Sequence, residues 1–403
     1  MFLQGRYLFA IIFLSITGFV GRKMYLYYFD TTSPIVIIQG IEEDKGYSGD
    51  IHISVKGSSK YKISHVSTWL DGTAMHDEFK VNRKQLDHPI SIACKSIADG
   101  CHTIKVEVVD ATKNKNTTRL EKIFYTDNLP LQASLVPLTS ASKVLQGRCL
   151  YLQLQVNKPV RSAVINILQN EYKFFPEHKN SLTLEAIVPI ECEQEAGEYP
   201  YTVDIVDYLG ASLMLEGKVQ VISFPFKRKT LTITGNKLQT ELEFTKLQEQ
   251  DLEELMEKLA KQSPQEKLWA GVFEIPIAMR GVTTDFGVIR TSQERGRKVH
   301  KALDLVADPK SVIWSSNHGI IVLKDRFTHT GNTVVVDHGC GVLSLYCHLL
   351  DYADNIQVGQ KVKKGHPLGR MGMTGYASGD HLHWEIRVNN IAIEPMQWTQ
   401  RWN

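Results

Sequence analysis

Apolar and polar positions alternate with a period of two in four stretches of the chain, at residues 51–55, 104–108, 150–156 and 201–205. Successive side chains of a β-strand point to opposite faces, so this alternation indicates strands with one buried face. Turn-forming pairs such as Asp71-Gly72 lie between the strands. We therefore predict that residues 33–224 form short strands.

A weak internal repeat divides this region. The segment that ends at Asp207 echoes the segment that ends at Asp110, 97 residues earlier, and the same offset aligns Leu150 with Ile53. A repeat of roughly 100 residues made of short strands has the size of an immunoglobulin-like sandwich. We predict two such sandwiches, at residues 34–130 and 131–225. We interpret them as spacers in preference to binding modules.

The first 33 residues differ from the rest in hydropathy. Residues 7–20 are almost entirely apolar, and Arg22 and Lys23 follow them. A spanning helix needs about 20 residues, a length that this stretch reaches only with neighbouring apolar residues included. No convincing small-x-small cleavage site follows, so we interpret residues 1–33 as an uncleaved signal anchor, with a cleaved signal peptide as the alternative. In both cases the remainder of the chain is predicted to be exported.

Helical periodicity occurs in residues 245–262, where Leu252, Leu255, Met256 and Leu259 recur at helical spacing. Ser263-Pro264 ends this pattern. We interpret residues 226–272 as a linker that contains a helix, in preference to a cover over the cleft of the next domain.

The last part of the chain, residues 273–403, is again β-rich and contains many glycines. Strands are predicted at residues 320–323, 333–336 and 343–348, with a tight turn at residues 337–341. The predicted fold is therefore mainly β. It consists of an N-terminal membrane helix, two immunoglobulin-like sandwiches, a linker helix and a C-terminal antiparallel β-sheet domain.

Charge and cysteine content exclude some functions. The formal net charge is +2 and no run of five or more basic residues occurs, so nothing indicates nucleic-acid binding. The six cysteines lack C-x₂-C spacing, which argues against a structural zinc cluster. Export permits disulfides. The possible pairs are Cys94–Cys101 and Cys149–Cys192, whereas Cys340 and Cys347 lie too far apart along one predicted strand.

The strongest chemical signal is the segment from His381 to Arg387. On a strand, His381, His383, Glu385 and Arg387 share one face, and the alternate residues form an apolar face. The two imidazoles would then lie about 7 Å apart along the strand. Two histidines so placed can share one metal site.

Two further segments add candidate residues. In the predicted strand at residues 343–349, the alternation places Ser344, Tyr346 and His348 on one face and Cys347 on the other, so we expect Cys347 to be a core residue and not a nucleophile. His300 and Asp304 are four residues apart, which puts them on one face of either a helix or a strand.

These residue types suit a catalytic zinc site, which needs three protein ligands and an open position. His300, Asp304 and one histidine of the His381/His383 pair would supply the ligands. His348 and the remaining histidine would stay free for proton transfer. Zinc lowers the pKa of bound water to about 7 and polarises a carbonyl, as amide hydrolysis requires.

Residues 281–398 resemble the lysostaphin-type (LytM-like) zinc endopeptidases of bacterial cell walls, through the segments GNTVVVDHG, LYCHL, VGQKVKKGHPLG and TGYASGDHLHWE. The resemblance implies one zinc ion per peptidase domain. It implies that His300, Asp304 and His383 are the metal ligands. It further implies that His348 and His381 are the catalytic pair, a division that spacing alone leaves open.

The chain departs from the family pattern at positions that carry no expected ligand. Ala302 and Asp380 stand where Gly and Pro are usual, and Arg290 comes one residue late after the Phe-Gly pair. Residues 308–311 lack the usual Gly-Thr-Pro. These departures bear on how substrate fits and not on metal binding.

The predicted function is zinc-dependent hydrolysis of peptide cross-links in bacterial peptidoglycan. The enzyme is predicted to have a single-pass anchor in the cell inner membrane, with its catalytic domain in the periplasm or outside the membrane. The alternatives are a catalytically silent LytM-like activator of another wall hydrolase and an adhesin or scaffold built on the sandwiches. All five key positions are present, which favours the enzyme. The sequence indicates no particular protein partner.

Overall fold

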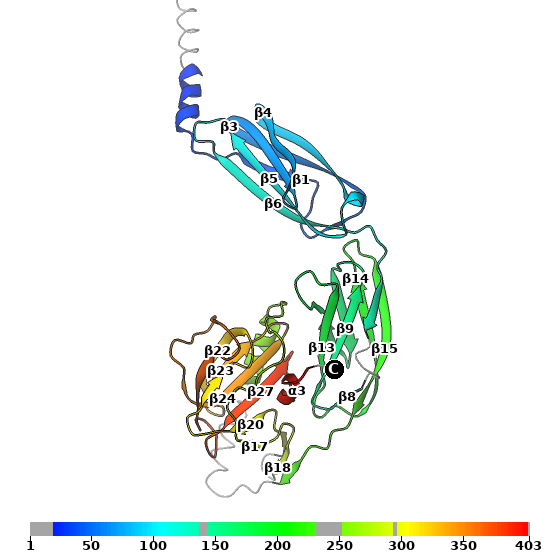
Figure 1. Cartoon of the computed structure of the whole chain (residues 1–403), viewed down its shortest axis with the longest axis vertical. Helices are drawn as coiled ribbons and strands as arrows, with labels where there is room; N and C mark the ends of the chain where they lie inside the picture. Colours follow the sequence, from blue (N-terminus) through cyan, green and yellow to red (C-terminus); the bar gives the residue numbers. More distant parts are fainter. Residues whose placement is uncertain (1–18, 137–142, 231–251, 293–295, 402–403) are drawn as a thin grey trace, which may run out of the picture. The chain divides into compact units, whose positions relative to one another are not determined.

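A computed structural model describes residues 19–136, 143–230, 252–292 and 296–401, and these residues are mainly β-strand. They divide into two compact units (Figure 1). The first unit contains the chain up to residue 132 together with loops 157–161 and 205–213. The second contains the rest of the chain from residue 133 onward.

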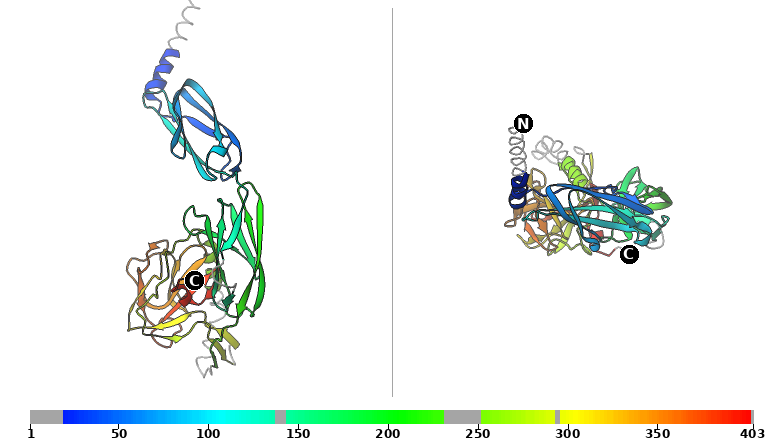
Figure 2. Two further views of the ribbon diagram at one scale, coloured as in Figure 1. Left: turned by 45° about the vertical axis from the view of Figure 1, so that its right-hand side comes forward. Right: turned by 90° about the horizontal axis from the view of Figure 1, so that it is seen from above.

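A sheet folded on itself forms the body of the first unit (Figures 1 and 2). One half of β3 pairs with β1, its other half pairs with β5, and β4 follows β3 along both halves. Val55 in the first half and Ile63 in the second are both completely buried in one core. The elements are β1 Ile35–Gln39, β2 Gly46–Tyr47, β3 Asp50–Leu70, β4 Thr73–Ala93, η1 Cys94–Ser96, β5 Gly100–Asp110 and β6 Thr117–Thr126.

The following strands form two sheets, in the orders β11-β10-β14-β15-β8 and β12-β13-β9-β7. Ile165 of the first sheet and Leu154 of the second are fully buried, as the sequence alternation predicts for one-sided strands. The strands are β7 Ala133–Val136, β8 Lys143–Leu145, β9 Cys149–Val156, β10 Ser162–Ile167, β11 Asn170–Lys173, β12 Phe175–Pro176, β13 Thr183–Pro189, β14 Gly197–Val206 and β15 Ser212–Ile222.

Asp110 and Asp207, which the sequence repeat equates, have the same structural role. Each carboxylate is buried and closes the turn that follows a strand. Asp110 Oδ1 accepts hydrogen bonds from the backbone N–H groups of Thr112 and Asn116, at 3.1 and 3.0 Å. Asp207 Oδ1 accepts from those of Leu209 and Ala211, at 3.0 and 2.8 Å. The repeat therefore reflects a shared turn as well as shared strands.

The C-terminal sheet has the central order β17-β20-β27-β24-β23-β22-β25, with β21, β26 and β28 attached to it. Strands β16, β18 and β19 form a separate small sheet. Their bounds are β16 Arg228–Thr230, β17 Gly281–Thr284, β18 Ile289–Ser292, β19 Gly296–Val299, β20 Leu303–Val306, β21 Val312–Trp314, β22 Gly319–Phe327, β23 Gly331–Asp337, β24 Val342–Tyr352, β25 Lys361–Val362, β26 Pro367–Met371, β27 Leu382–Val388 and β28 Ile391–Ile393; helix α3 is Pro395–Trp398.

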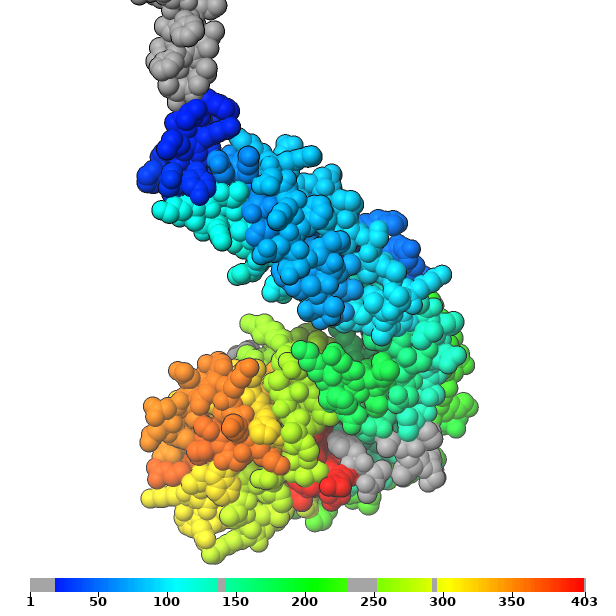
Figure 3. Space-filling view, turned by 45° about the horizontal axis from the view of Figure 1, so that its top comes forward, coloured from blue at the N-terminus to red at the C-terminus, as the bar shows by residue number. Residues whose placement is uncertain are grey.

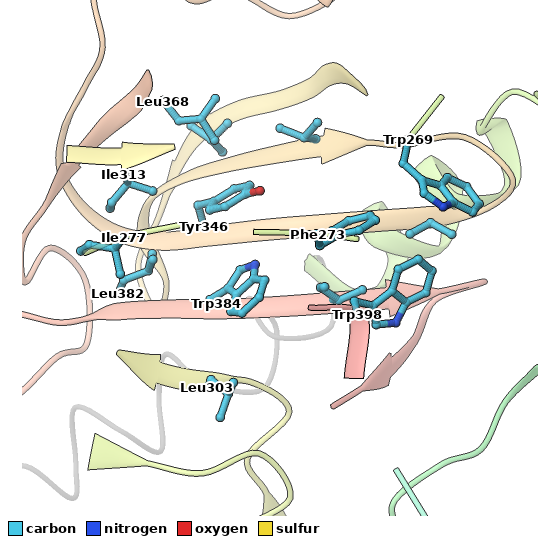
Figure 4. Packing of buried hydrophobic residues seen from close by; sticks show 14 of the residues in the cluster. Trp269, Phe273, Ile277, Leu303, Ile313, Tyr346, Leu368, Leu382, Trp384 and Trp398 are labelled. Atoms are coloured by element: carbon cyan, nitrogen blue, oxygen red, sulfur yellow. The ribbon is translucent and has the colours of Figure 1, made fainter. Parts of the chain in front are cut away.

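One face of this sheet carries the main core of the second unit. Figure 4 shows Leu303 of β20, Tyr346 of β24 and Leu382 and Trp384 of β27 directed to the same side. The apolar face predicted for the strand at residues 382–388 is confirmed, because each of its alternate apolar residues is at most 1% exposed. His383 of β27 must therefore lie on the opposite face.

The helix at residues 252–262 covers part of that opposite face. Met256 is completely buried against Leu343, Leu345 and Cys347 of β24. Figure 3 shows the lime segment after residue 251 in contact with the yellow and orange atoms of the sheet. The interpretation of this helix as a plain linker was therefore wrong, because its apolar stripe is buried on the sheet.

The second unit contains a continuous core that joins β9 and β13 to the C-terminal sheet. Cys149, Phe175 and Ile187 belong to the same buried cluster as Trp269. The Gln397 side chain also accepts a hydrogen bond from the backbone N–H of Cys149, at 2.8 Å, and donates one to its carbonyl, at 2.9 Å. Strands β9 and β13 are thus packed against the C-terminal domain.

The segment predicted as a membrane anchor, residues 1–33, lies outside the described residues up to residue 18. Residues 19–29 are helical. Among the helices that the structure describes, none combines the length and the apolar character needed to span a membrane.

The cysteines all lie within the described residues, and all are free thiols. Cys94 is buried whereas Cys101 is exposed on β5, so these two side chains do not meet. Cys149 pairs across the sheet with Pro189, which places Cys192 three residues beyond its register. Neither possible disulfide is formed.

Candidate functional site

Adjacent antiparallel strands bring together the three predicted metal ligands. Asp304 of β20 is directly opposite His383 of β27, and His300 lies in the short connection between β19 and β20. The Oδ1 atom of Asp304 lies 3.0 Å from Nε2 of His300 and 3.0 Å from Nδ1 of His383. Ligand atoms of all three residues lie within 4.8 Å of one another.

His348 and His381 complete the cluster. The His348 ring centroid lies 4.7 Å from that of His381 and 5.8 Å from that of His383. Nε2 of His381 is 3.7 Å from Oδ1 of Asp304. The five residues singled out from the sequence are therefore gathered in one place.

Backbone carbonyls fix the protonation of three rings. The Nδ1 atoms of His300, His348 and His381 contact the carbonyl oxygens of Asp285, Thr374 and Gly379, at 3.1, 2.8 and 2.9 Å. A carbonyl oxygen only accepts hydrogen bonds, so each Nδ1 must carry the proton. In the neutral form, each Nε2 then presents a lone pair. Hydrogen bonds of this kind to neighbouring groups orient metal ligands and catalytic imidazoles.

His348 reaches the site through a break in the β24 ladder. The register shifts between the pairs Val334–Tyr346 and Asn332–Leu349, and His348 itself has a φ of +62°. Positive φ is uncommon for a residue other than glycine and marks an irregular position. The alternation predicted for this strand was wrong here, because Tyr346 points into the core while His348 joins His381 and His383.

Ser344 also belongs to the core side. Its hydroxyl lies 2.9 Å from the Tyr346 hydroxyl and 2.7 Å from Nε2 of His338, and all three residues are completely buried. These polar groups satisfy one another inside the domain and do not line the site.

Two loops hold His348 in this irregular position. The Thr374 carbonyl accepts from His348, and the Thr374 hydroxyl donates to the carbonyl of Leu349 at 2.7 Å. Gly375 has a φ of +78°, and a Cβ there would lie 2.3 Å from the backbone nitrogen of Gly331. Glycine is therefore required for the two loops to approach this closely.

Shifted pKa values give Asp304 and His348 different charges at neutral pH. Burial raises the pKa of Asp304, but the close imidazoles of His300 and His383 outweigh it and hold that pKa far below its usual value. Burial, together with the neighbouring His383, lowers the pKa of His348 to about 3. Asp304 is therefore ionised and His348 neutral at neutral pH.

Cys347 is a core residue, as predicted. It is 1% exposed, and burial raises the pKa of its thiol to about 12. A thiol that stays protonated is a poor nucleophile.

The donor set fits a zinc ion. The Nε2 atom of His300 and the Oδ1 atom of Asp304 both present lone pairs across 3.0 Å, a contact that is favourable only when a cation neutralises it. Two imidazole nitrogens and one carboxylate oxygen are a zinc ligand set that leaves a coordination position open. Among the described residues, this is the group of metal-ligating side chains with such geometry.

No sequence pattern predicts the roles of the carbonyls of Asp285, Thr374 and Gly379, because any residue type supplies a carbonyl. Arg290 was noted only for its spacing. Its Nη2 lies 3.8 Å from Oδ2 of Asp304, and its side chain is 38% exposed, so it borders the site.

Comparison with known proteins defines the class of this domain. Residues 298–395 match the model described as Peptidase family M23 and form a domain of that family. Peptidoglycan DD-endopeptidase ShyC of Vibrio cholerae is 31% identical over 121 residues, which are 30% of this chain and 28% of that protein. DD-carboxypeptidase/endopeptidase Mpg of Neisseria meningitidis is 32% identical over 127 residues, 31% of this chain and 29% of that protein.

The chain thus spans under a third of the length of these curated relatives. Among solved structures, a putative peptidase M23 from Pseudomonas aeruginosa aligns with a TM-score of 0.45 and 20% identity, covering 63% of this chain and 94% of that one.

Proposed function

We propose that this chain is a zinc-dependent endopeptidase that hydrolyses peptide cross-links of bacterial peptidoglycan. The observation that carries the proposal is the ligand group His300, Asp304 and His383 with two further imidazoles beside it. The family of the domain and the names of its relatives support the substrate class.

His300, Asp304 and His383 would hold the zinc ion, which when bound supplies a Lewis acid for the scissile carbonyl and increases the acidity of the attacking water. The residues of the chain provide the proton transfers. His348 is neutral and its Nδ1–H is held by Thr374, so its Nε2 is available to accept a proton. His381 has the same arrangement with Gly379. One imidazole can take the proton of the water, and the leaving amine can be protonated by the other.

The alternative of a catalytically silent activator receives no support from the site. A silent member of such a family would lack part of the ligand or catalytic set. Here each of the five side chains is present and within reach of the others.

Release of soluble fragments from purified peptidoglycan by the full chain in detergent tests the function. We expect release that a chelator abolishes and that zinc restores, and we expect none from a His381→Ala variant that still binds zinc. The fragment masses would identify the bond that is cut. Zinc binding without release from any type of wall would contradict the proposal.

We also propose a single-pass inner-membrane location with the catalytic domain in the periplasm. The helical residues 19–29 expose Tyr25, Tyr28 and Phe29, and aromatic side chains of this kind are enriched at membrane interfaces. The Tyr27 carbonyl accepts a hydrogen bond from the backbone N–H of Lys113 at 2.9 Å, so this helix is joined to the first sandwich. Recovery of the full chain in the salt-washed membrane fraction would support the proposal, and recovery in the soluble periplasm would contradict it.

A further inference from the structure

The helix at residues 252–262 lies outside residues 298–395, the part of the chain that matches the peptidase family. The helix is nevertheless attached to the C-terminal sheet near its start and just after its end. Met256 is buried on β24 near its start. Just after its end, the Ser263 hydroxyl donates to Asp337 at 2.7 Å and accepts from the backbone N–H of Gly341 at 3.0 Å.

Glu253, in the first turn of this described segment, binds Arg387 of β27 in a two-point ion pair. The distances are 2.6 Å from Nη1 to Oε2 and 3.1 Å from Nη2 to Oε1. Arg387 is only 3% exposed. Paired hydrogen bonds of this kind fix the plane of a guanidinium group and are stronger than neutral ones.

Arg387 also binds a second carboxylate, that of Glu385. Its Nε donates to Oε1 of Glu385 at 2.6 Å, and Glu385 is 4% exposed. The other oxygen of the same carboxylate, Oε2, lies 3.9 Å from Nε2 of His383. That nitrogen is on the opposite side of the ring from Nδ1, which faces Asp304.

Glu253 also neighbours the segment that carries the other imidazole ligand. Its Oε1 is 3.5 Å from Nζ of Lys301, the residue after His300. The Glu253 carboxylate therefore contacts Lys301, which follows His300, and Arg387, which lies on the same strand as His383.

We propose that Glu253 is a positioning residue of the metal centre, acting on His383 through Arg387 and Glu385. This inference rests on the proposed zinc site. The Glu385 carboxylate lies 3.9 Å from Nε2 of His383, beyond direct hydrogen-bond distance, and its negative charge favours a proton on Nε2 while Nδ1 binds the metal. A neighbouring carboxylate of this kind sets the tautomer and the basicity of a ligand histidine. The helix is then a functional part of the peptidase domain.

The charges explain why Glu253 is needed. Arg387 shares its single positive charge between two carboxylates. Without Glu253, the buried guanidinium would be neutralised by Glu385 alone, and Glu385 would be held more tightly to Arg387 and less available to His383. Zinc affinity should fall as a result, although none of the metal ligands has changed.

Glu253→Gln in the full chain tests this inference, with Glu257→Gln as the matched control. Glu257 lies on the same helix and forms a surface ion pair with Lys261. Zinc affinity of the metal-free proteins is measured by competition with a chromophoric chelator, and thermal unfolding is recorded in parallel. We expect a loss of about tenfold in affinity for Glu253→Gln, the lower end of the range for second-shell partners, and a change under about twofold for the control.

A second measurement separates positioning from a general weakening of the fold. In a double-mutant cycle, Glu253→Gln should weaken zinc binding much less when Glu385 is already Gln, because Glu253 affects His383 only through Glu385. Additive losses, equal losses in both helix variants, or unchanged zinc affinity in Glu253→Gln would overturn the inference. If the unmodified chain itself binds no zinc, the proposed function fails and not only this inference.

Discussion

Asp304 and His383 face each other across β20 and β27, with 3.0 Å between Oδ1 of the carboxylate and Nδ1 of the imidazole. His300 approaches the same oxygen from the chain just before β20, also at 3.0 Å. One carboxylate oxygen of Asp304 therefore contacts both of the imidazole nitrogens that we propose as metal ligands.

Replacing Asp304 should remove metal binding with little change in side-chain volume. We expect Asp304→Asn to weaken zinc affinity by more than about 100-fold, beyond the usual effect of losing a second-shell partner, and to abolish hydrolysis. Equilibrium dialysis with zinc measures the loss. The exposed Asp351, which pairs with Arg370 on the surface, gives a matched control as Asp351→Asn. Retained zinc binding in Asp304→Asn would contradict the ligand assignment.

His348 should act in catalysis and not in metal binding. His348→Gln removes the Nε2 base, and general acid–base groups typically contribute 10²- to 10⁴-fold to rate. We expect a fall in kcat of about that size with zinc content unchanged, measured by fragment release and metal analysis on the same sample. A variant that lost its zinc in proportion to its activity would speak against this division of roles.

The metal-free chain should lose stability as the pH is lowered through the acidic range. The pKa of His348 falls to about 3 on folding, below the unfolded value of about 6.5. The unfolded chain therefore binds more protons between these values, and the free energy of unfolding decreases toward low pH by up to about 1.4 kcal/mol per pH unit. The depressed pKa of Asp304 adds a loss below about pH 4.

Urea unfolding of metal-free protein at pH 7, 6 and 5 measures this dependence. Asp304 stays ionised over that interval in both states. Burial also lowers the pKa of His338, to about 4, and that of His88, so the contribution of His348 is the difference between the unmodified chain and a variant without this imidazole. The His348→Gln variant should have a flatter profile than the unmodified chain. Parallel profiles for the two proteins would contradict the assignment.

Packing of the helix at residues 252–262 should contribute measurably to folding stability. Met256→Ala removes a completely buried side chain from the contact with β24. Substitutions of this kind cost about 2–5 kcal/mol. Chemical unfolding measures the change, and Lys258→Ala on the exposed side of the same helix is the control. Equal stability of the two variants would show that the helix is not docked in solution.

Much of the fold follows from local patterns. The apolar face of residues 382–388 and the alternating strands of the sandwiches required only period-two alternation, and the structure confirms them. The five site residues were recognisable because histidine and aspartate at fixed spacing are uncommon in a core. The choice between His381 and His383 as ligand came from family resemblance, since both lie on one face of β27.

The errors arose where distant residues decide the outcome. His348 departs from strand alternation because Thr374 and the loops around it hold its backbone at positive φ. The helix near Met256 looked like a linker because its partners, Leu343 and Arg387, are far along the chain. No local pattern encodes contacts of that sequence separation.

The shared core of β9, β13 and the C-terminal sheet determines where a recombinant catalytic fragment can begin. A fragment starting at residue 273 would leave the apolar surface that meets Phe175 and Ile187 open to water, and it would lack Trp269 as well as Met256. Such a truncation invites aggregation even if every ligand is intact. The smallest expressible enzyme should therefore start near residue 133, the first residue of the second compact unit.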